Sequence, residues 1–442
     1  MLELRPVRMT PLDVTLRRLE AVVSPHTGIV CSTVEHLRGY GEARFVGTGC
    51  LLAATDEVLG TRSVDTAGGA HVSRAASRAA ALGEAVERYS GTATSNADRP
   101  RVTAESLGDA AVDPTLFTFF RPEQLATPGF PFVPFTAQTP VRWVAGFRVP
   151  TCEPALLPAQ LVFLGSPPTD EPLVAYATSS GLACGGTLEE AILSGLLELV
   201  ERDGFMIVWA NRLSLPLLDW AGDPVLERIE RLYLAPSGLR FAAVDASCFF
   251  GIPAVLGVVH GPDGDAGRLG LGGAAAVTIQ EAVRKALTEA FWVQQGSRDL
   301  ARAAAAVPRA DEIRDFDDHL LFHSDPAKDE LTAFLDASDE RRSTREVPPL
   351  EGDDVRELIE AAAAKLLVHG VSLYAADVTT PDIRDVGLSV ARVVSPELCP
   401  LDVIHLARFL GPRRLFHAAH ELGLREAPLT MATVNHDPHP FP

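Results

Sequence analysis

Cysteine is scarce in this chain, and the few cysteines form no recognisable pattern. Six are spread over 442 residues, with no Cys-x-x-Cys pair and no Cys and His set at zinc-ligand spacing. Disulfide-rich domains and structural zinc sites both depend on such clusters. The scarcity excludes a disulfide framework and a zinc site, and we expect each cysteine to be a small buried residue.

Long apolar runs and an excess of basic residues are also missing. No apolar stretch approaches the roughly 20 residues that span a bilayer, and the N-terminal stretch has neither the apolar core nor the cleavage site of a secretory signal. Only 39 Lys and Arg face 58 Asp and Glu, for a net charge of −19. We therefore expect a cytoplasmic protein that binds neither nucleic acid nor membrane, in which local arginines or metal meet any anionic ligand.

The familiar nucleotide-binding signatures are absent from the sequence as well. It has no G-x-x-x-x-G-K-[S/T] P-loop, no protein-kinase signature set and no G-x-G-x-x-G following a strand. The run G-L-G-G at 270–273 is a weak glycine signal that a tight turn explains. A nucleotide site in this chain must therefore use another architecture.

What the chain does contain is a five-residue pattern that appears twice: Glu84-x-x-Glu87-Arg88 and Glu198-x-x-Glu201-Arg202. Positions i, i+3 and i+4 share one face of a helix, so each copy presents two carboxylates and a guanidinium together. Both copies lie in apolar, small-residue stretches that are predicted to be helical, from about residue 73 to 89 and from about residue 188 to 209.

Carboxylates in such apolar settings need a partner, because removing their water costs several kcal/mol each. A single copy is explained by surface salt bridges, but two copies favour bound divalent metal. Clustered oxygen ligands without Cys or His indicate Mg²⁺ rather than zinc or iron, and Mg²⁺ in such sites usually bridges phosphates. The pattern predicts a magnesium-nucleotide site in which Arg88 or Arg202 meets the phosphates.

Strands and helices alternate irregularly, which predicts a mixed α/β (α+β) fold in one large unit over 1–442. A third helix, entered from the glycine run, carries Glu281 and Glu289. We expect four parts, namely an N-terminal helix with strands (1–70), a core with both motif helices (71–296), a charged variable insertion (297–352) and a C-terminal part with a proline-rich tail (353–442). The insertion is expected to be mobile or a loose helical excursion, because it is charged and poor in aromatic residues.

The chain resembles the YcaO superfamily in four stretches that occur in the right order: SRAASRAAALGEAVERYSG, ATSSGLACGGTLEEAILSGLLELVERDG, DVTTPDIRDVGLSVARVVSPEL and the ending DPHPFP. The resemblance covers nearly the whole chain. It implies a YcaO-type fold with mixed β-sheets, packed helices and a non-Walker site for ATP and Mg²⁺. It also implies that the protein activates a peptide backbone amide.

The resemblance further implies roles for residues of the predicted helices. The metal ligands would be Glu84, Glu87, Glu198 and Glu201. The nucleotide would be lined by Ser77, Glu190 and Arg202, with Thr15 and Arg18 of the first helix as weaker candidates.

The tail Pro438-His439-Pro440-Phe441-Pro442 matches the PxPxP ending that is typical of azoline-forming cyclodehydratases from modified-peptide pathways such as those of thiopeptides. Prolines hold a chain extended at low entropic cost, so a terminal segment can be threaded into a site. The resemblance brings Pro438, Pro440 and Pro442 to the catalytic centre. The Pro442 carboxylate is a candidate for proton handling, and appending one glycine would leave turnover unchanged if that idea is wrong.

The implied reaction converts Cys, Ser or Thr of a ribosomal precursor peptide to thiazoline or oxazoline. The side chain attacks the preceding amide carbonyl, ATP phosphorylates the resulting oxyanion, and loss of phosphate completes a net dehydration. Two alternatives remain open. One is a thioamide- or amidine-forming YcaO enzyme, against which the tail argues, and the other is an inactive scaffold that binds the precursor.

Three positions depart from the superfamily pattern. Gly69-Ala70-His71 stands where Gly-Lys-Gly is common, Ser180 replaces a usual Asn, and Trp292 lies near a position often held by Gln. These departures motivate the scaffold alternative.

The resemblance also implies partners for the chain. Cyclodehydratases need a leader-peptide-binding partner related to ubiquitin-activating enzymes (ThiF-like), which is sometimes fused at the N-terminus. Because the YcaO-like pattern begins almost at once, we expect that partner to be a separate protein. The resemblance also implies a homodimer, since members of the superfamily are often dimers.

Overall fold

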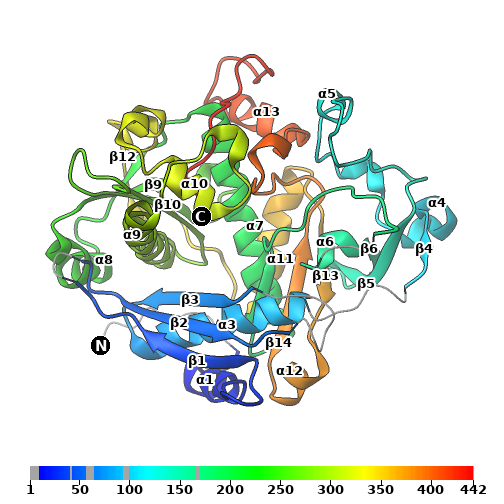
Figure 1. Ribbon diagram of the computed structural model, residues 1–442, viewed down its shortest axis with the longest axis horizontal. Coiled ribbons are helices and arrows are strands. Elements are labelled where there is room, and N and C mark those ends of the chain that lie inside the picture. The colour runs from blue at the N-terminus through cyan, green and yellow to red at the C-terminus, as the bar shows by residue number, and fades with distance from the viewer. Residues whose placement is uncertain (1–8, 40–41, 56–63, 93–98, 166–168, 442) are drawn as a thin grey trace.

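Three β-sheets and a set of packed helices make up the architecture of this protein (Figure 1). The computed structural model describes residues 9–39, 42–55, 64–92, 99–165 and 169–441. Nearly all strand pairs in the sheets are antiparallel, and helices cover the sheets. The mixed helix and strand content that the sequence predicts is confirmed.

Helix α7 (Leu188–Asn211) runs through the middle of the molecule (Figure 1). Thr187 begins it by accepting a hydrogen bond from the Glu190 N–H, and Arg212 ends it in the left-handed conformation. Apolar residues cover most of its circumference, which is the pattern of a helix buried on all sides. The second copy of the glutamate motif is therefore carried by a core helix.

A six-stranded antiparallel sheet packs against α7. Its strand order is β4 (Arg101–Val102), β5 (Val141–Val149), β13 (Leu373–Asp377), β14 (Ser389–Val394) and β7 (Leu182–Gly185), and β6 (Pro154–Pro158) pairs with β5. Strands β14 and β7 contact α7, which also packs on α11 (Val355–Val368) and α13 (Arg413–Glu421). This packing joins the second motif helix to the C-terminal part.

A five-stranded sheet lies on the other side of α7. Its order is β11 (Leu269–Ala275), β10 (Ala254–His260), β9 (Arg240–Asp245), β8 (Leu217–Asp219) and β12 (Arg341–Ser343), and the last pair is parallel. Helix α9 (Ile279–Ala303) lies along β10 and β11. The expectation of a tight turn at 270–273 was wrong, since these glycines lie inside β11. They let α9 approach closely, because a Cβ on Gly272 would lie 2.6 Å from the Ala286 carbonyl oxygen.

The N-terminal part forms a small antiparallel sheet of β1 (Val30–Glu35), β2 (Val46–Leu52) and β3 (Thr66–His71). Helix α3 (Arg74–Thr92), which carries the first glutamate motif, packs against β2, β3 and α1 (Leu12–Glu20). Helix α3 also touches β7, and α9 touches β3. Helices α3 and α9 therefore both contact the small sheet.

The segment 297–352, expected to be mobile or a loose helical excursion, contains helices and is packed against the rest of the protein. Helix α9 continues through its start to Ala303, α10 (Phe316–Phe322) follows, and β12 joins the five-stranded sheet. Side chains from the whole segment are buried, including Ile313, His319, Leu335 and Leu350. Most of its charged side chains are exposed, while a few apolar residues along it face the core.

The short helices of the structure are α4 (Ala104–Leu107), α5 (Pro122–Leu125), α6 (Ala159–Val162), α8 (Pro224–Ile229) and α12 (Pro381–Asp385). All six cysteines are free, as the spacing predicts, but only Cys50 and Cys399 are buried, so the expected burial was wrong for the other four. Among the described residues, no helix is both long enough and apolar enough to cross a bilayer.

Candidate nucleotide and metal site

The first glutamate motif is fixed by backbone amides of two different sheets. One oxygen of Glu84 accepts a hydrogen bond from the Gly68 N–H of β3 at 2.9 Å, and the other lies 3.2 Å from the Arg88 guanidinium. The Glu87 carboxylate accepts from the Cys184 N–H of β7, also at 2.9 Å. Because β3 and β7 belong to separate sheets, the two carboxylates of α3 lie at the junction between them.

The second motif helix, α7, contacts β7 as α3 does. Arg202 makes ion pairs with both glutamates of its own motif, at 3.7 Å from Glu198 and 3.2 Å from Glu201. The Glu201 and Arg202 side chains are only 11% and 15% exposed. Glu198 also accepts a hydrogen bond from the Gly181 backbone. Each copy of the pattern therefore has two carboxylates and only one arginine, so the negative charges outnumber the positive ones.

A fifth carboxylate joins these four, and sequence reasoning assigned it no role. Glu289 of α9 accepts a hydrogen bond from the Gly273 N–H of β11 at 2.8 Å, and its charge interacts with those of Arg202, Glu198 and Glu84. Gly273 needs to be glycine, because a Cβ there would lie 2.9 Å from a Glu201 oxygen. The signal for Glu289 was a charged row of Glu281, Lys285 and Glu289, each four residues apart on one helix face, which by itself does not tell what the face meets.

Burial leaves these carboxylates short of positive charge. Burial raises the pKa of Glu87 to about 8, with the neighbouring charges of Glu84 and Glu198 adding to the rise. Burial likewise raises the pKa of Glu201 to about 8, although Arg202 opposes the shift. The pKa values of Glu198 and Glu289 are raised by burial as well. A divalent cation would supply the missing charge, so the donor set fits Mg²⁺.

As they stand, no three His, Cys, Asp or Glu side chains within the described ranges converge closely enough to hold an ion. The carboxylates instead bind backbone amides and arginines: Glu84 and Glu87 accept hydrogen bonds from backbone N–H groups, and Glu201 pairs with Arg202. Their assignment as metal ligands therefore stays a prediction.

These raised pKa values predict how the metal-free protein responds to pH. Glu87 and Glu201 keep protons in the folded state that they release on unfolding, so their contribution to stability is present below the ordinary pKa of 4.5 and is lost as pH rises through about 8. We expect the melting temperature without metal to fall by a few °C between about pH 6 and about pH 8.5. Glu87→Gln should flatten this fall, whereas the exposed control Glu105→Gln should leave it. Identical slopes in both variants would contradict the shift at Glu87.

A buried arginine of β14 borders the same region. Arg392 donates hydrogen bonds to the carbonyl oxygens of Leu161 and Thr178, at 3.0 and 2.7 Å. Burial lowers its pKa to about 10, against the attraction of Glu198. It thereby adds positive charge next to the carboxylates, and nothing in its sequence surroundings indicated this.

The predicted nucleotide-lining residues cluster at two places beside the carboxylates. Glu190 accepts hydrogen bonds from the N–H groups of Thr10 and Gly186, at 2.9 and 2.8 Å, while Arg18 donates to the carbonyl oxygens of Gly186 and Gly387. Glu190 and Arg18 therefore meet at Gly186.

Ser77 and Thr15 are both buried, at the start of α3 and within α1. The Ser77 hydroxyl donates to the Gly69 carbonyl oxygen at 2.9 Å and lies 2.8 Å from the Thr48 hydroxyl. Thr15 bonds within its own helix, to the Pro11 carbonyl oxygen at 3.3 Å. Thr15 thus has a structural partner, and its predicted nucleotide contact remains a prediction.

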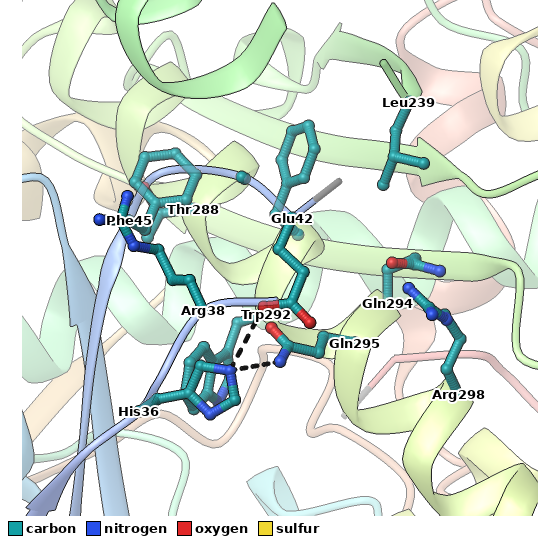
Figure 2. Close-up of a pocket in the computed structure, with 12 residues that line it drawn as sticks. His36, Arg38, Glu42, Phe45, Leu239, Thr288, Trp292, Gln294, Gln295 and Arg298 are labelled. Atoms are coloured by element: carbon teal, nitrogen blue, oxygen red, sulfur yellow. Dashed lines mark hydrogen bonds and ion pairs between the residues drawn. The ribbon is translucent and has the colours of Figure 1, made fainter. Parts of the chain in front are cut away.

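The three departures fall at different distances from the carboxylates. Ala70 pairs with Gly47 in the small sheet, next to the Ser77 partner Gly69, and Ser180 is buried before β7. Trp292 packs against Gly47 so closely that an added Cβ would lie 2.1 Å from its ring. Trp292 also lines a small pocket together with His36 and Gln295 (Figure 2). None of the predicted site residues lines that pocket.

The proline-rich tail reaches the second glutamate motif. The Phe441 ring is fully buried, lies under the Arg202 guanidinium with 4.6 Å between them, and packs on Phe205 at a ring distance of 4.4 Å. Figure 1 shows this end of the chain beside α10 and α7. Pro438 and Pro440 lie on the segment that leads to Phe441, whereas the predicted role of Pro442 falls outside the described residues.

Comparison with known proteins gives a family and a fold. A family profile described as YcaO cyclodehydratase, ATP- and Mg²⁺-binding, matches residues 68–399. An uncharacterised protein of Methanothermobacter thermautotrophicus is 28% identical over 342 residues, covering 75% of this chain and 80% of that protein. An uncharacterised protein in the tfuA 3′ region of Rhizobium leguminosarum bv. trifolii is 34% identical over 133 residues, or 27% of this chain and 29% of that protein.

Among solved structures, a heterocyclase in complex with substrate and cofactor has a TM-score of 0.80 and 28% identity, covering 100% of this chain and 59% of its own. The heterocyclase TruD has a TM-score of 0.68 and 25% identity, covering 100% of this chain and 55% of its own. YcaO from Methanopyrus kandleri bound with AMPPCP and Mg²⁺ shares the fold at a TM-score of 0.62, with 19% identity and coverage of 92% and 96%. This chain, with its carboxylate site and its YcaO heterocyclase fold, belongs to the ATP- and Mg²⁺-binding YcaO family.

Proposed function

We propose that this protein is an ATP-dependent cyclodehydratase that converts Cys, Ser or Thr of a ribosomal precursor peptide to thiazoline or oxazoline. The observation that carries the proposal is the position of Phe441, which brings the proline-rich tail onto Arg202 and next to the Glu201 carboxylate. The similarity to two heterocyclase structures supports it as well.

The residues of the site divide the work in this proposal. Glu84, Glu87, Glu198 and Glu201 would hold Mg²⁺, and Arg88 and Arg202 would bind phosphate oxygens. Ser77, Glu190, Thr15 and Arg18 would line the nucleotide. ATP with Mg²⁺ supplies the phosphoryl group that turns the amide oxygen of the peptide into a leaving group.

The chain's own side chains prepare this site before any ligand arrives. The Arg202 guanidinium lies between Glu198, Glu201 and the Phe441 ring. In this position it would stabilise the negative charge that develops on the phosphate oxygens during transfer. The Phe441 ring, itself packed on Phe205, covers that guanidinium with apolar surface, which excludes water and strengthens its interactions. Glu289 would support the metal ligands from α9.

This chain spans only 59% and 55% of the two heterocyclase chains that it matches. Its substrate and partners are therefore proposed here and not taken over from those proteins. We propose that a separate leader-binding, ThiF-like protein presents the precursor peptide. The E. coli microcin synthetase McbBCD, whose fold is similar, has been solved as a complex and with pro-MccB17 bound. The homodimer also stays a prediction.

Reconstitution with a Cys-, Ser- and Thr-rich precursor peptide tests the reaction. The expected product loses the mass of one water molecule for each ring, and each ring from cysteine consumes one thiol. Loss of water with consumption of an amine would indicate an amidine, and replacement of oxygen by sulfur would indicate a thioamide. Calorimetry with Mg²⁺ and a non-hydrolysable ATP analogue tests the scaffold alternative, which absence of binding would favour.

A further inference from the structure

His319 of α10 and His323, the residue that follows the end of this helix, contact the backbone of the proline-rich tail. The Nδ1 atom of His319 lies 2.8 Å from the His439 carbonyl oxygen, and the Nε2 atom of His323 lies 2.7 Å from the Pro438 carbonyl oxygen. His319 and His323 are four residues apart, so they project from the same side of the helix end. Both side chains are buried. Neither contributes to the metal and nucleotide site described above.

The tail completes this contact with a histidine of its own. His439 stacks on His319 with 4.0 Å between ring centroids and an interplanar angle of 11°. Its Nε2 atom lies 2.8 Å from the Asp402 carbonyl oxygen, and its Nδ1 atom accepts from the Phe441 N–H at 3.2 Å. One neutral tautomer, with the proton on Nε2, satisfies both bonds of His439. That tautomer therefore connects the histidines directly to Phe441.

Proline explains why side chains must do this binding. Pro438 and Pro440 have no N–H group, so the tail cannot form a regular strand ladder and offers mainly carbonyl oxygens. Donors for these oxygens have to come from elsewhere, and α10 supplies them. Trp209 of α7 adds one more donor, to the Asp437 carbonyl oxygen at 3.1 Å, and Arg212 pairs with the Asp437 carboxylate.

We propose that His319 and His323 are positioning residues of the proposed cyclodehydratase, which hold the carbonyl oxygens of Pro438 and His439 so that Phe441 stays on Arg202. The inference rests on the proposed function for its catalytic consequence but not for the contact itself. The inference assigns a role to the segment 297–352, which contains both histidines. His319 is 120 residues from His439 in the chain, and His323 is 115 residues from Pro438.

The charges around the three rings set the direction of a pH effect. Burial lowers the pKa of His319, His323 and His439, and that of His323 falls to about 3. The neighbouring cations Lys328 and Arg408 lower these values further. The Asp402 carboxylate opposes the lowering of the His319 pKa. The other titratable or charged groups nearby are His405, His436, Arg212 and Asp437.

The bonds of His323 and His439 are satisfied by neutral rings, whereas His319 faces a carbonyl oxygen at each ring nitrogen, that of His439 at Nδ1 and that of Val403 at Nε2, 3.0 Å away, and a neutral ring donates to only one of them. A proton on Nδ1 of His439 would remove the acceptor of the Phe441 N–H. Since the folded pKa values lie below the ordinary 6.5, the bound tail loses stability as pH falls below that value.

Hydrogen exchange of the tail tests the contact without any activity. His319→Phe with His323→Phe keeps two rings of similar volume but removes both donors, and we expect amide exchange in a peptide covering 430–441 to rise by roughly 10-fold or more. His323→Gln keeps a donor and should restore part of the protection lost in His323→Phe. The matched control is His420→Phe, because His420 is exposed on α13 and also meets a carbonyl oxygen, that of Arg425. Unchanged exchange in the folded double variant would overturn the proposal.

A double-mutant cycle tests the catalytic consequence. It combines the double histidine variant with a shortened chain that ends at Asp437. If the histidines act through the tail, the double variant should lower kcat by roughly 10-fold or more with little change in the ATP KM, and should cause no further loss in the shortened chain. The acid limb of the wild-type kcat profile should disappear in the shortened chain. An equal loss of kcat with and without the tail would overturn the positioning role. Absence of cyclodehydration in the wild type would count against the proposed function alone, because the exchange experiment would still decide the contact.

Discussion

Replacing Glu198 with glutamine is expected to reduce ATP-dependent turnover by roughly 10³-fold or more, because it removes one charge from the proposed metal ligands while keeping side-chain volume. Burial raises the pKa of Glu198, so the folded protein disfavours the charged form of this side chain. The ion pair with Arg202 offsets that effect only in part. The variant should therefore fold at least as stably as the wild type and yet fail in catalysis. Steady-state phosphate release with the precursor peptide measures the effect.

Glu189→Gln is the matched control for this prediction. Glu189 lies on the same helix, but its carboxylate faces Arg356 at 3.8 Å and is 37% exposed. We expect less than a two-fold change in turnover there, as for other exposed ion pairs. Calorimetry should show weakened binding of Mg²⁺ with an ATP analogue to Glu198→Gln and unchanged binding to Glu189→Gln. Full activity of Glu198→Gln would refute metal ligation at this position.

Truncating Phe441 to alanine is expected to lower turnover by roughly 10²-fold while the nucleotide still binds. The fully buried ring separates Arg202 and Phe205 from solvent, so its loss admits water to the guanidinium. The carboxylates of both motifs are untouched by the change, which is why binding should persist. The measurement is kcat together with the affinity for the ATP analogue.

Phe334→Ala controls for the loss of an aromatic ring against the same helix. Phe334 packs on Trp209 of α7 at a ring distance of 5.6 Å, away from Arg202. It should lower the melting temperature without a comparable loss of kcat. Phe441→Leu keeps apolar bulk and should recover part of the activity. If Phe334→Ala and Phe441→Ala lower kcat equally, the tail has no special role at the site.

The helices and their charged faces were predictable because their signal is local. Glu84 and Glu87 are three residues apart, as are Glu198 and Glu201, so the helical period alone puts each pair on one face. The same local reasoning failed at Gly272. A glycine run at a turn and a glycine run inside a strand look alike until a helix such as α9 packs on it.

The segment 297–352 shows the same limit from another side. Its composition indicated a solvated insertion, yet His319 and His323 are buried against the tail. Composition reports how much of a segment must face water, and it does not report which few residues turn inward.

The amino-acid sequence by itself determined the paired carboxylates with their arginines, the absence of a P-loop and the extended proline-rich end, since periodicity, motif spacing and backbone stiffness are properties of short stretches. Only the tertiary structure decided that Glu289 joins those carboxylates, that Phe441 lies on Arg202 and that α10 holds the tail. Each of these contacts joins residues far apart in the chain, such as Phe441 and Arg202. Their pairing depends on how buried faces pack in three dimensions, which no local pattern encodes.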